Sequence, residues 1–367
     1  MHRTVRFRDL SVSDAALRAE LLGAVDRVLA HGQILLGPEV AEFEAMVAED
    51  CGRKFCVGFA SGSDALFLAL KALEIGAGDE VITTPLSWIA TLNAIHLTGA
   101  TAVFADIGAD MNIDPERIKA AIGPNTRAIV PVHFNGRLCD MAAIGKIARE
   151  HDLLVIEDAA QAYGANREGR AAGSFGDAAA FSFNPMKVLP GYGESGAVVT
   201  DDPAVRDRLS ALRYLGMVDR EVCRWPGLNA KIDTLQAAML LVSRRHFEKA
   251  VVRRLEIART YTTELGTVAT CPQVPEGSDR PSVFFDYQIL VEEREALREY
   301  LAGRGIETKI KHWPLMPDQP AYAATGRPPL PVAERLVQRN LCLPIHEKMS
   351  DADVAYVIEA VRAFHGG

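Results

Sequence analysis

The chain has 367 residues, of which 49% are hydrophobic, and a formal net charge of −8. A chain of this length is usually too long to fold around one compact hydrophobic core, which indicates a large domain and a smaller one. The acidic balance and the lack of a dense Lys/Arg run argue against a nucleic-acid partner. A charged fraction of 24% argues against global disorder.

The six cysteines are scattered, none forms a Cys-x-x-Cys pair, and no Cys/His cluster has zinc spacing. We therefore expect reduced thiols in a cytoplasmic protein and no bound metal. The first 14 residues carry no apolar signal core, and no stretch approaches the roughly 20 apolar residues of a membrane helix. We expect no membrane partner.

The first predicted elements are helices. Apolar residues recur at helical spacing over residues 13–31, and Gly32 ends this pattern. A second helix is predicted over about residues 39–49, because Pro38 has the fixed φ that suits a first helical turn. Short apolar runs then alternate with helical segments over residues 55–215.

Continuous apolar runs in this region predict buried strands. They lie at residues 55–60, 80–84, 101–107, 127–134, 153–159, 177–183 and 196–201. Helices are predicted near residues 64–73, 88–98, 115–122, 140–150 and 232–265. Strands separated by helices indicate an α/β fold with a mostly parallel sheet sandwiched by helices.

The composition changes after this region. Residues 271–282 are rich in proline and polar side chains, which indicates a boundary. Beyond it we predict strands over residues 284–291 and 308–313, and helices over 293–305 and 351–365. We assign residues 1–245 to an N-terminal arm and a large domain, and residues 246–367 to a small C-terminal α+β domain.

Two charged residues lie at or just beyond the carboxyl ends of predicted strands. Asp158 ends the run LLVIED, and ligand sites in parallel sheets lie beyond the carboxyl ends of strands. The alternative is that Asp158 caps the next helix. Lys187 lies between Met186 and Val188, beside a glycine-rich turn. A partly desolvated amine there would suit an imine, although most loop lysines are simply solvated.

Other residues fit around these two as the site of one cofactor. Ser182 has a hydroxyl suited to a phosphate, and Gly62-Ser63 opens a helix directly after a strand, which makes an anion site or a plain helix cap. Pyridoxal phosphate (PLP) needs an imine-forming lysine, an acid at its ring nitrogen, a phosphate cradle and an aromatic plane. Trp88 would supply that plane, or would pack in the core.

The chain resembles the DegT/StrS family of PLP-dependent sugar aminotransferases, which have the aspartate-aminotransferase fold (fold type I). The similarity covers nearly the whole chain. The matching segments are ILLGPEVAEFE, FASGSDALFLALKALEIGAGDEVITTPLSWIATLNAI, GATAVFADI, VIEDAAQAYGA, GSFGDAAAFSFNPMK, GESGAVVTDD and LNAKIDTLQAAML. That many segments in one order are hard to obtain by chance.

The resemblance implies roles for individual residues. Lys187 matches the Schiff-base lysine, and Asp158 matches the acid at the pyridine nitrogen. Gln161 matches a glutamine near the cofactor's phenolic oxygen, and Trp88 falls where the family places an aromatic ring. The phosphate-binding positions are matched by Gly62, Ser63 and Ser182. Asn229 matches an asparagine that reaches the phosphate of the neighbouring subunit, which implies a homodimer with shared active sites.

The resemblance also implies a ping-pong reaction through an internal aldimine at Lys187. An amino acid, by family habit glutamate, converts PLP to pyridoxamine phosphate, which then aminates a keto sugar. Relatives with histidine in place of this lysine are dehydratases, so the lysine favours transamination. The alternatives are a PLP- or pyridoxamine-dependent sugar dehydratase, another fold-type-I enzyme, and a non-catalytic PLP-binding regulator.

The substrate end departs from the family's usual sequence. Residues 307–314 read ETKIKHWP, with three basic or potentially basic side chains at Lys309, Lys311 and His312. They predict recognition of an anionic group such as a diphosphate, phosphate or sugar carboxylate. We therefore expect a keto sugar that is nucleotide-linked or otherwise anionic. The alternative is a solvated strand edge, where lysine is common.

Overall fold

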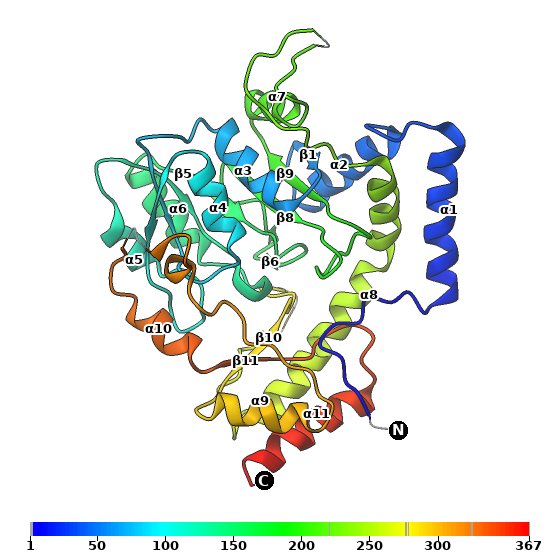
Figure 1. Cartoon of the computed structure of the whole chain (residues 1–367), viewed down its shortest axis with the longest axis vertical. Coiled ribbons are helices and arrows are strands. Elements are labelled where there is room, and N and C mark those ends of the chain that lie inside the picture. Colours follow the sequence, from blue (N-terminus) through cyan, green and yellow to red (C-terminus); the bar gives the residue numbers. More distant parts are fainter. Residues whose placement is uncertain (1–2, 220, 276, 278, 324–325, 367) are drawn as a thin grey trace.

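The chain begins with an extended arm that leads into two helices. The computed structural model describes residues 3–219, 221–275, 277, 279–323 and 326–366. Asp14 caps α1 (Ala15–His31) by accepting two main-chain N–H groups, and Gly32 ends it in the left-handed conformation. Helix α1 packs against α8 (Thr234–Leu265) and otherwise stands apart from the body in Figure 1. Helix α2 (Pro38–Asp50) follows, and both helices begin within two residues of their predicted starts.

A seven-stranded sheet lies at the centre of the large part, in the order β1-β9-β8-β5-β4-β2-β3. Its strands are β1 (Phe55–Phe59), β2 (Glu80–Thr83), β3 (Thr101–Phe104), β4 (Thr126–Val130), β5 (Leu154–Asp158), β8 (Ala178–Ser182) and β9 (Gly196–Thr200). Only β9 runs antiparallel to its neighbours β1 and β8. The predicted mostly parallel sheet is confirmed.

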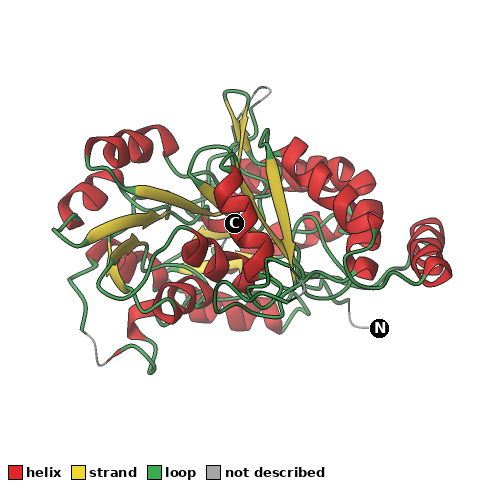
Figure 2. Cartoon of the chain, turned by 90° about the horizontal axis from the view of Figure 1, so that it is seen from above, coloured by secondary structure: helices red, strands yellow, loops and turns green. Residues whose placement is uncertain are grey.

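Helices cover both faces of this sheet (Figure 2). They include α3 (Gly62–Ala72), α4 (Ala90–Leu97), α5 (Pro115–Ala121), α6 (Met141–Glu150) and α7 (Pro203–Leu212). In β8, Ala179 and Phe181 pack in the core on the side of α2 and α8, whereas Ala178 and Ala180 pack on the side of α3 and α7. Burial on both faces explains why the strands read as continuous apolar runs. The hairpin β6 (Asn166–Arg167) and β7 (Arg170–Ala171) had no predicted counterpart.

The small part contains an antiparallel pair, β10 (Tyr287–Leu290) and β11 (Asn340–Leu343). Its helices are α9 (Arg294–Ala302), α10 (Pro331–Val337) and α11 (Asp351–Phe364). Short 3-10 turns include η1 (Phe134–Gly136), in the large part, and η2 (Met316–Asp318). The predicted strand over residues 308–313 is wrong. This described segment forms a single bridge, between Lys309 and Cys342, and His312 then turns the chain with a φ of 62° that no strand residue adopts.

Helix α8 connects the two parts. Its first half packs against α1, and its second half packs in the core of the small part with α11. The predicted domain boundary between residues 245 and 246 falls inside this helix, which belongs to both parts. Neither α8 nor any other described helix is long and apolar enough to cross a membrane.

The N-terminal arm belongs to the small part. Val5 forms a parallel bridge with Ile306, and Arg3 Nη2 lies 2.8 Å from Asp353 Oδ1 on α11. The arm therefore runs along the small part before the chain enters the large part (Figure 1). This route places residues from opposite ends of the sequence beside each other.

Candidate active site

The candidate residues gather where the parallel strands end. Strand β1 leads into the first turn of α3, β2 leads into the loop that carries Trp88, and β5 ends at Asp158. Strand β8 ends at Ser182, five residues before Lys187. Because these strands are parallel, their carboxyl ends share one edge of the sheet. The predicted residues at this edge are Gly62, Ser63, Trp88, Asp158, Gln161, Ser182 and Lys187.

Helix α3 begins in close contact with β8. Ser61 caps the helix, since its Oγ accepts the Asp64 N–H at 3.0 Å and donates to the Asp64 carboxylate at 2.8 Å. A Cβ built on Gly62 would lie 2.5 Å from Ser182 Cβ and 2.9 Å from Ser182 Oγ. Only glycine lets the helix start so near this hydroxyl. The first N–H groups of α3 and the Ser182 hydroxyl therefore form a cradle of donors that suits a phosphate.

Asp158 is 6% exposed and has few partners. Thr91 Oγ1 donates to its Oδ2 at 2.7 Å, and the Ala160 N–H donates to its Oδ1 at 3.2 Å. Thr91 Oγ1 also lies 2.9 Å from Ser87 Oγ, which ties the carboxylate to the loop before α4. The residues after β5 form turns up to β6, so the helix-capping explanation of Asp158 is wrong.

Lys187 lies in a turn in which its N–H donates to Asn184 O at 2.8 Å. Burial lowers the pKa of its amine to about 8, because the charged form loses solvation, while Asp158 opposes this shift and Lys311 adds to it. Its Nζ lies 4.6 Å from the centroid of the Phe285 ring. A lysine with this pKa is partly neutral near physiological pH and is available as a nucleophile or base.

Three cations surround the Phe285 ring. Besides Lys187, the Nζ of Lys311 lies 4.6 Å and the Cζ of Arg8 4.8 Å from the ring centroid. The buried Asp286 pairs with both: Arg8 Nη2 donates to its Oδ1 at 2.6 Å, and Lys311 Nζ donates to its Oδ2. Burial would raise the pKa of the Asp286 carboxyl, but Lys311 and Arg8 hold it below the ordinary value.

The sequence analysis did not single out Arg8 or Asp286. An aspartate inside the apolar run FFDYQILV was the one local signal for Asp286, because a charged residue is rarely buried without a partner. Nothing local marks Arg8, which lies 278 positions away from Asp286 along the chain. Only the path of the N-terminal arm brings the two together.

The three predicted basic residues near the substrate end are separated. Lys309 is exposed. The Nζ of Lys311, by contrast, lies over the Phe285 ring, which the Nζ of Lys187 also contacts. The His312 ring lies 5.1 Å from the Phe134 ring and contacts the main chain of Ser87. Burial lowers the pKa of His312 to about 4, and Lys311 adds to this shift, so the imidazole is neutral at pH 7.

Three further predicted residues take different positions. Gln161 is buried, and its Oε1 accepts a main-chain N–H of η1 at 2.9 Å. Trp88 is 67% exposed, so the alternative of core packing is wrong. Asn229 is exposed in a segment beside the end of β1, where the Ala60 N–H donates to Ala230 O at 2.8 Å. Asn229 therefore lies on the surface near the start of α3.

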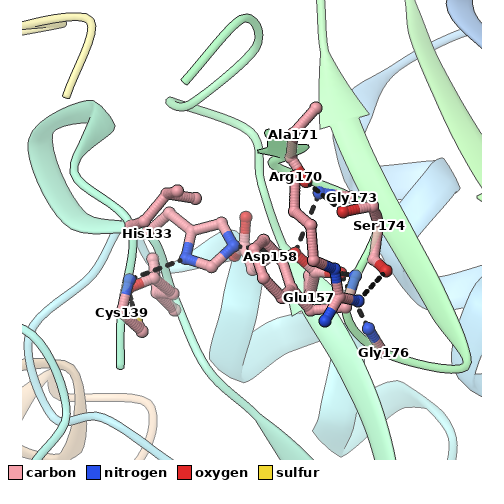
Figure 3. A network of polar contacts seen from close by, with 12 residues as sticks. His133, Cys139, Glu157, Asp158, Arg170, Ala171, Gly173, Ser174 and Gly176 are labelled. Atoms are coloured by element: carbon pink, nitrogen blue, oxygen red, sulfur yellow. Dashed lines mark hydrogen bonds and ion pairs between the residues drawn. The ribbon is translucent and has the colours of Figure 1, made fainter. Parts of the chain in front are cut away.

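Behind Asp158, a buried polar network holds β5 in place (Figure 3). Neighbouring strand residues alternate between faces, so Glu157 points away from the site and pairs with His133 Nε2 at 2.9 Å. Its other donors are the N–H groups of Gly173, Phe175 and Gly176, at 2.7–2.9 Å. His133 Nδ1 accepts the Cys139 N–H at 3.2 Å, so Nε2 carries the proton. Burial would raise the pKa of the Glu157 carboxyl, but these bonds hold it below its ordinary value.

Comparison with known proteins gives a family for this arrangement. The chain matches the model of the DegT/DnrJ/EryC1/StrS aminotransferase family over residues 15–362. The dTDP-3-amino-3,6-dideoxy-alpha-D-galactopyranose transaminase of Aneurinibacillus thermoaerophilus is 39% identical, with 98% of this chain and 99% of that protein covered. A Geobacillus stearothermophilus protein named pleiotropic regulatory protein is 36% identical, with 97% of each covered.

Solved structures agree with the sequence relatives. The crystal structure of DesV from S. venezuelae in complex with a ketimine intermediate superimposes with a TM-score of 0.94. It is 40% identical, and 98% of each chain is covered. The architecture is therefore that of fold type I PLP enzymes, as the sequence implied. The chain belongs to the DegT/DnrJ/EryC1/StrS aminotransferase family.

Proposed function

We propose that this protein is a PLP-dependent aminotransferase that converts a keto sugar to an amino sugar. The observation that carries the proposal is the amine of Lys187, whose pKa is lowered to about 8. It lies at the same edge of the sheet as the buried carboxylate of Asp158 and the donor cradle at Gly62. Membership of a sugar aminotransferase family supports the reaction, and the named transaminases among the relatives support the substrate class.

The residues present fit pyridoxal 5′-phosphate. Its phosphate would be held by Gly62, Ser63 and Ser182, where the lack of a side chain on the glycine lets the start of α3 lie against the serine. Asp158 would accept a hydrogen bond from the protonated pyridine nitrogen, because each of its oxygens accepts one hydrogen bond and has room for a second. Gln161 would donate to the phenolic oxygen, and the exposed indole of Trp88 would cover the ring.

The chain's own residues then have distinct tasks. When bound, the cofactor supplies an electron sink that stabilises negative charge on the carbon that carries the amine. Lys187 would hold the cofactor covalently and, once released by an amino substrate, would move a proton to and from that carbon. Asp158 would keep the pyridine nitrogen protonated, while the Glu157 network keeps β5 in position. Phe285 would exclude water on the side of the small part.

The donor and the acceptor are part of the proposal. We infer a ping-pong sequence with glutamate as donor and with a nucleotide-linked or otherwise anionic keto sugar as acceptor. Lys311 and His312 support recognition of an acidic or hydroxyl-bearing group, because Lys311 lowers the pKa of Lys187 and Lys187 in turn lowers the pKa of His312. Lys309 has less support, because its side chain is exposed.

We propose that the active protein is a homodimer in which Asn229 reaches the phosphate of the partner subunit's cofactor. Apolar side chains around Asn229 remain exposed, which favours a second copy as their cover. They are Ile34, Leu35, Leu36, Tyr214, Leu215 and Leu228, each 37–56% exposed. Main-chain bridges join Leu35 to Asp233 and Tyr214 to Asn229, so these apolar residues border the segment 228–233, and we call them the Asn229 surface.

A cytoplasmic location is also part of the proposal. All six cysteines are free thiols, as is typical of a reducing compartment. Four of them, Cys51, Cys56, Cys139 and Cys342, are buried. Burial raises the pKa of these four thiols, which makes them unreactive and gives them a packing role.

The first half-reaction tests the proposed function. PLP-loaded protein is mixed with glutamate in the absence of a keto sugar. We expect the yellow absorbance band to be lost and one 2-oxoglutarate to be released per site. Lys187→Ala should abolish both signals, whereas Lys309→Ala should keep them. A loaded wild-type protein that stays yellow with every amino donor tried would contradict the proposal.

A further inference from the structure

We propose that Lys311 binds the α-carboxylate of the amino donor, and that Asp286 and Arg8 are positioning residues that hold Lys311 in place. The proposal rests on the proposed function and adds a donor subsite to the same site. Its components are a loop after α9, the start of β10 and the N-terminal arm. None of these segments belongs to the cofactor-binding edge of the sheet.

The first argument is distance. The Nζ atoms of Lys187 and Lys311 each lie 4.6 Å from the centroid of the Phe285 ring, so they cannot be more than twice that distance apart. The donor's nitrogen takes the place of the Lys187 amine, and its α-carboxylate is bonded to the carbon that carries this nitrogen. Lys311 is also close enough to lower the pKa of Lys187. A cation beside this amine suits the α-carboxylate, whereas the diphosphate of a nucleotide sugar is several bonds further from the reacting carbon.

The second argument is charge. Arg8, Lys311 and Asp286 together carry one unbalanced positive charge. The guanidinium of Arg8 is occupied by the protein, since it donates to Asp286, to Phe285 O and, at 2.8 Å, to Ile345 O. Lys311 is different: within the described chain, Asp286 takes one of its three N–H groups. Its remaining donors are the ones free to bind an anion.

The third argument is exposure. The side chain of Asp286 is 0% exposed and that of Lys311 is 22% exposed, so the carboxylate is sealed from solvent whereas the lysine side chain is partly accessible. A carboxylate buried between two cations gains little net stability, because desolvation offsets the attraction. It does fix the position of the ammonium. Asp286 therefore positions Lys311 as a fixed cation beside the proposed reaction site.

The same subsite has to accept the second substrate of a ping-pong cycle. A keto sugar carries a hydroxyl-bearing carbon next to its carbonyl, where the donor carries its carboxylate. Lys311 can donate to that hydroxyl, and the neutral His312 adds a polar neighbour without adding charge. The Lys311 ammonium would therefore bind the carboxylate of the donor and the neutral hydroxyl of the sugar in turn.

The test uses matched donors and matched variants of the PLP-loaded protein. Isoglutamine is glutamate with its α-carboxylate replaced by an amide. In Lys311→Gln, the glutamate concentration for half-maximal rate of the first half-reaction should rise by roughly ten- to a hundredfold. The isoglutamine value should change by less than about threefold, because a neutral amide gains little from the ammonium. Lys146→Gln, on α6 and with a side chain that is 72% exposed, should change neither value.

Two further measurements separate binding from a structural effect. Calorimetry with 2-methylglutamate and its α-amide, which lack the proton to be removed, should show the wild-type preference for the carboxylate and its loss in Lys311→Gln. Lys311→Arg should restore most of this preference. Asp286→Asn should raise the glutamate KM while leaving kcat within about threefold, because it displaces the ammonium without removing it.

The outcomes are distinguishable. If no amino donor converts the wild-type protein, the proposed function fails. If the wild type reacts and Lys311→Gln keeps its preference for glutamate over isoglutamine, the donor subsite fails and the proposed function stands. An equal loss with both donors also overturns the subsite, because it would assign Lys311 to another part of the reaction.

Discussion

The amine of Lys187 should titrate near pH 8, far below an exposed lysine. Burial disfavours the charged form, and the attraction of Asp158 offsets this only in part. At pH 7.5, an amine with a pKa of about 8 is about one quarter neutral, whereas a lysine at 10.5 is about one thousandth neutral. In cofactor-free protein, Lys187 should therefore carry about two hundred times more reactive amine than an exposed lysine at that pH.

Site-resolved amine labelling measures this directly. Cofactor-free protein is labelled with a trace of acylating reagent from pH 6 to 10, and each lysine is quantified by peptide mass spectrometry, with Lys309 as an exposed reference. Asp158→Asn should move the Lys187 midpoint to lower pH, because the carboxylate favours the charged amine. Lys311→Gln should move it to higher pH, because a repelling cation is lost. A Lys187 midpoint in the range of an ordinary exposed lysine would refute the reasoning.

Three other predictions follow from the same structure. Gly62→Ala should weaken PLP binding at least about tenfold in a fluorescence titration, because the new methyl collides with Ser182 and displaces a donor of the phosphate cradle. Gly23→Ala in the open part of α1 should leave binding unchanged and stabilise the protein by about 0.5–1 kcal/mol. Equal affinities would contradict the cradle. Glu157→Gln should lower the free energy of unfolding by about 2–4 kcal/mol at pH 7 in urea melts. The pKa of the Glu157 carboxyl is lower in the folded state than in the unfolded state. Its contribution to stability is therefore fully present above the unfolded-state pKa and is lost as the pH falls through the folded-state pKa. In Glu157→Gln, the free energy of unfolding should fall less steeply with acid than in the wild type, and identical pH profiles would argue against the network. Leu35→Lys should convert a dimer to monomers in sedimentation velocity. Leu97 is also an exposed leucine but lies on α4, so Leu97→Lys should not have this effect. A Leu35→Lys protein that remains dimeric would exclude the Asn229 surface as the interface.

The sheet was predictable because its strands are buried on both faces. Ala178 to Phe181 read as one apolar run, since alternate residues pack in different cores. The predicted strand over residues 308–313 failed for a local reason. Lys309 and Lys311 flank an isoleucine and give the alternation of an edge strand, but His312 takes a left-handed conformation that ends any pairing.

The candidate site was predictable only where a short segment carries the signal. Asp158 ends a strand, Lys187 follows one, and Gly62 opens a helix, so position along the chain was informative. Arg8 and Asp286 are 278 positions apart in the sequence, and no pattern near either residue predicts that the two form a contact. Contacts of this kind depend on how the arm and the small part pack, which local periodicity does not encode.

One measurement tests the central claim most directly. PLP-loaded protein is treated with borohydride, which makes the bond between cofactor and lysine permanent, and its peptides are mapped by mass spectrometry. We predict that the cofactor is found on Lys187 in the peptide that follows β8, and that Lys187→Ala protein carries none. Cofactor attached to another lysine, or none retained by the wild-type protein, would contradict the account.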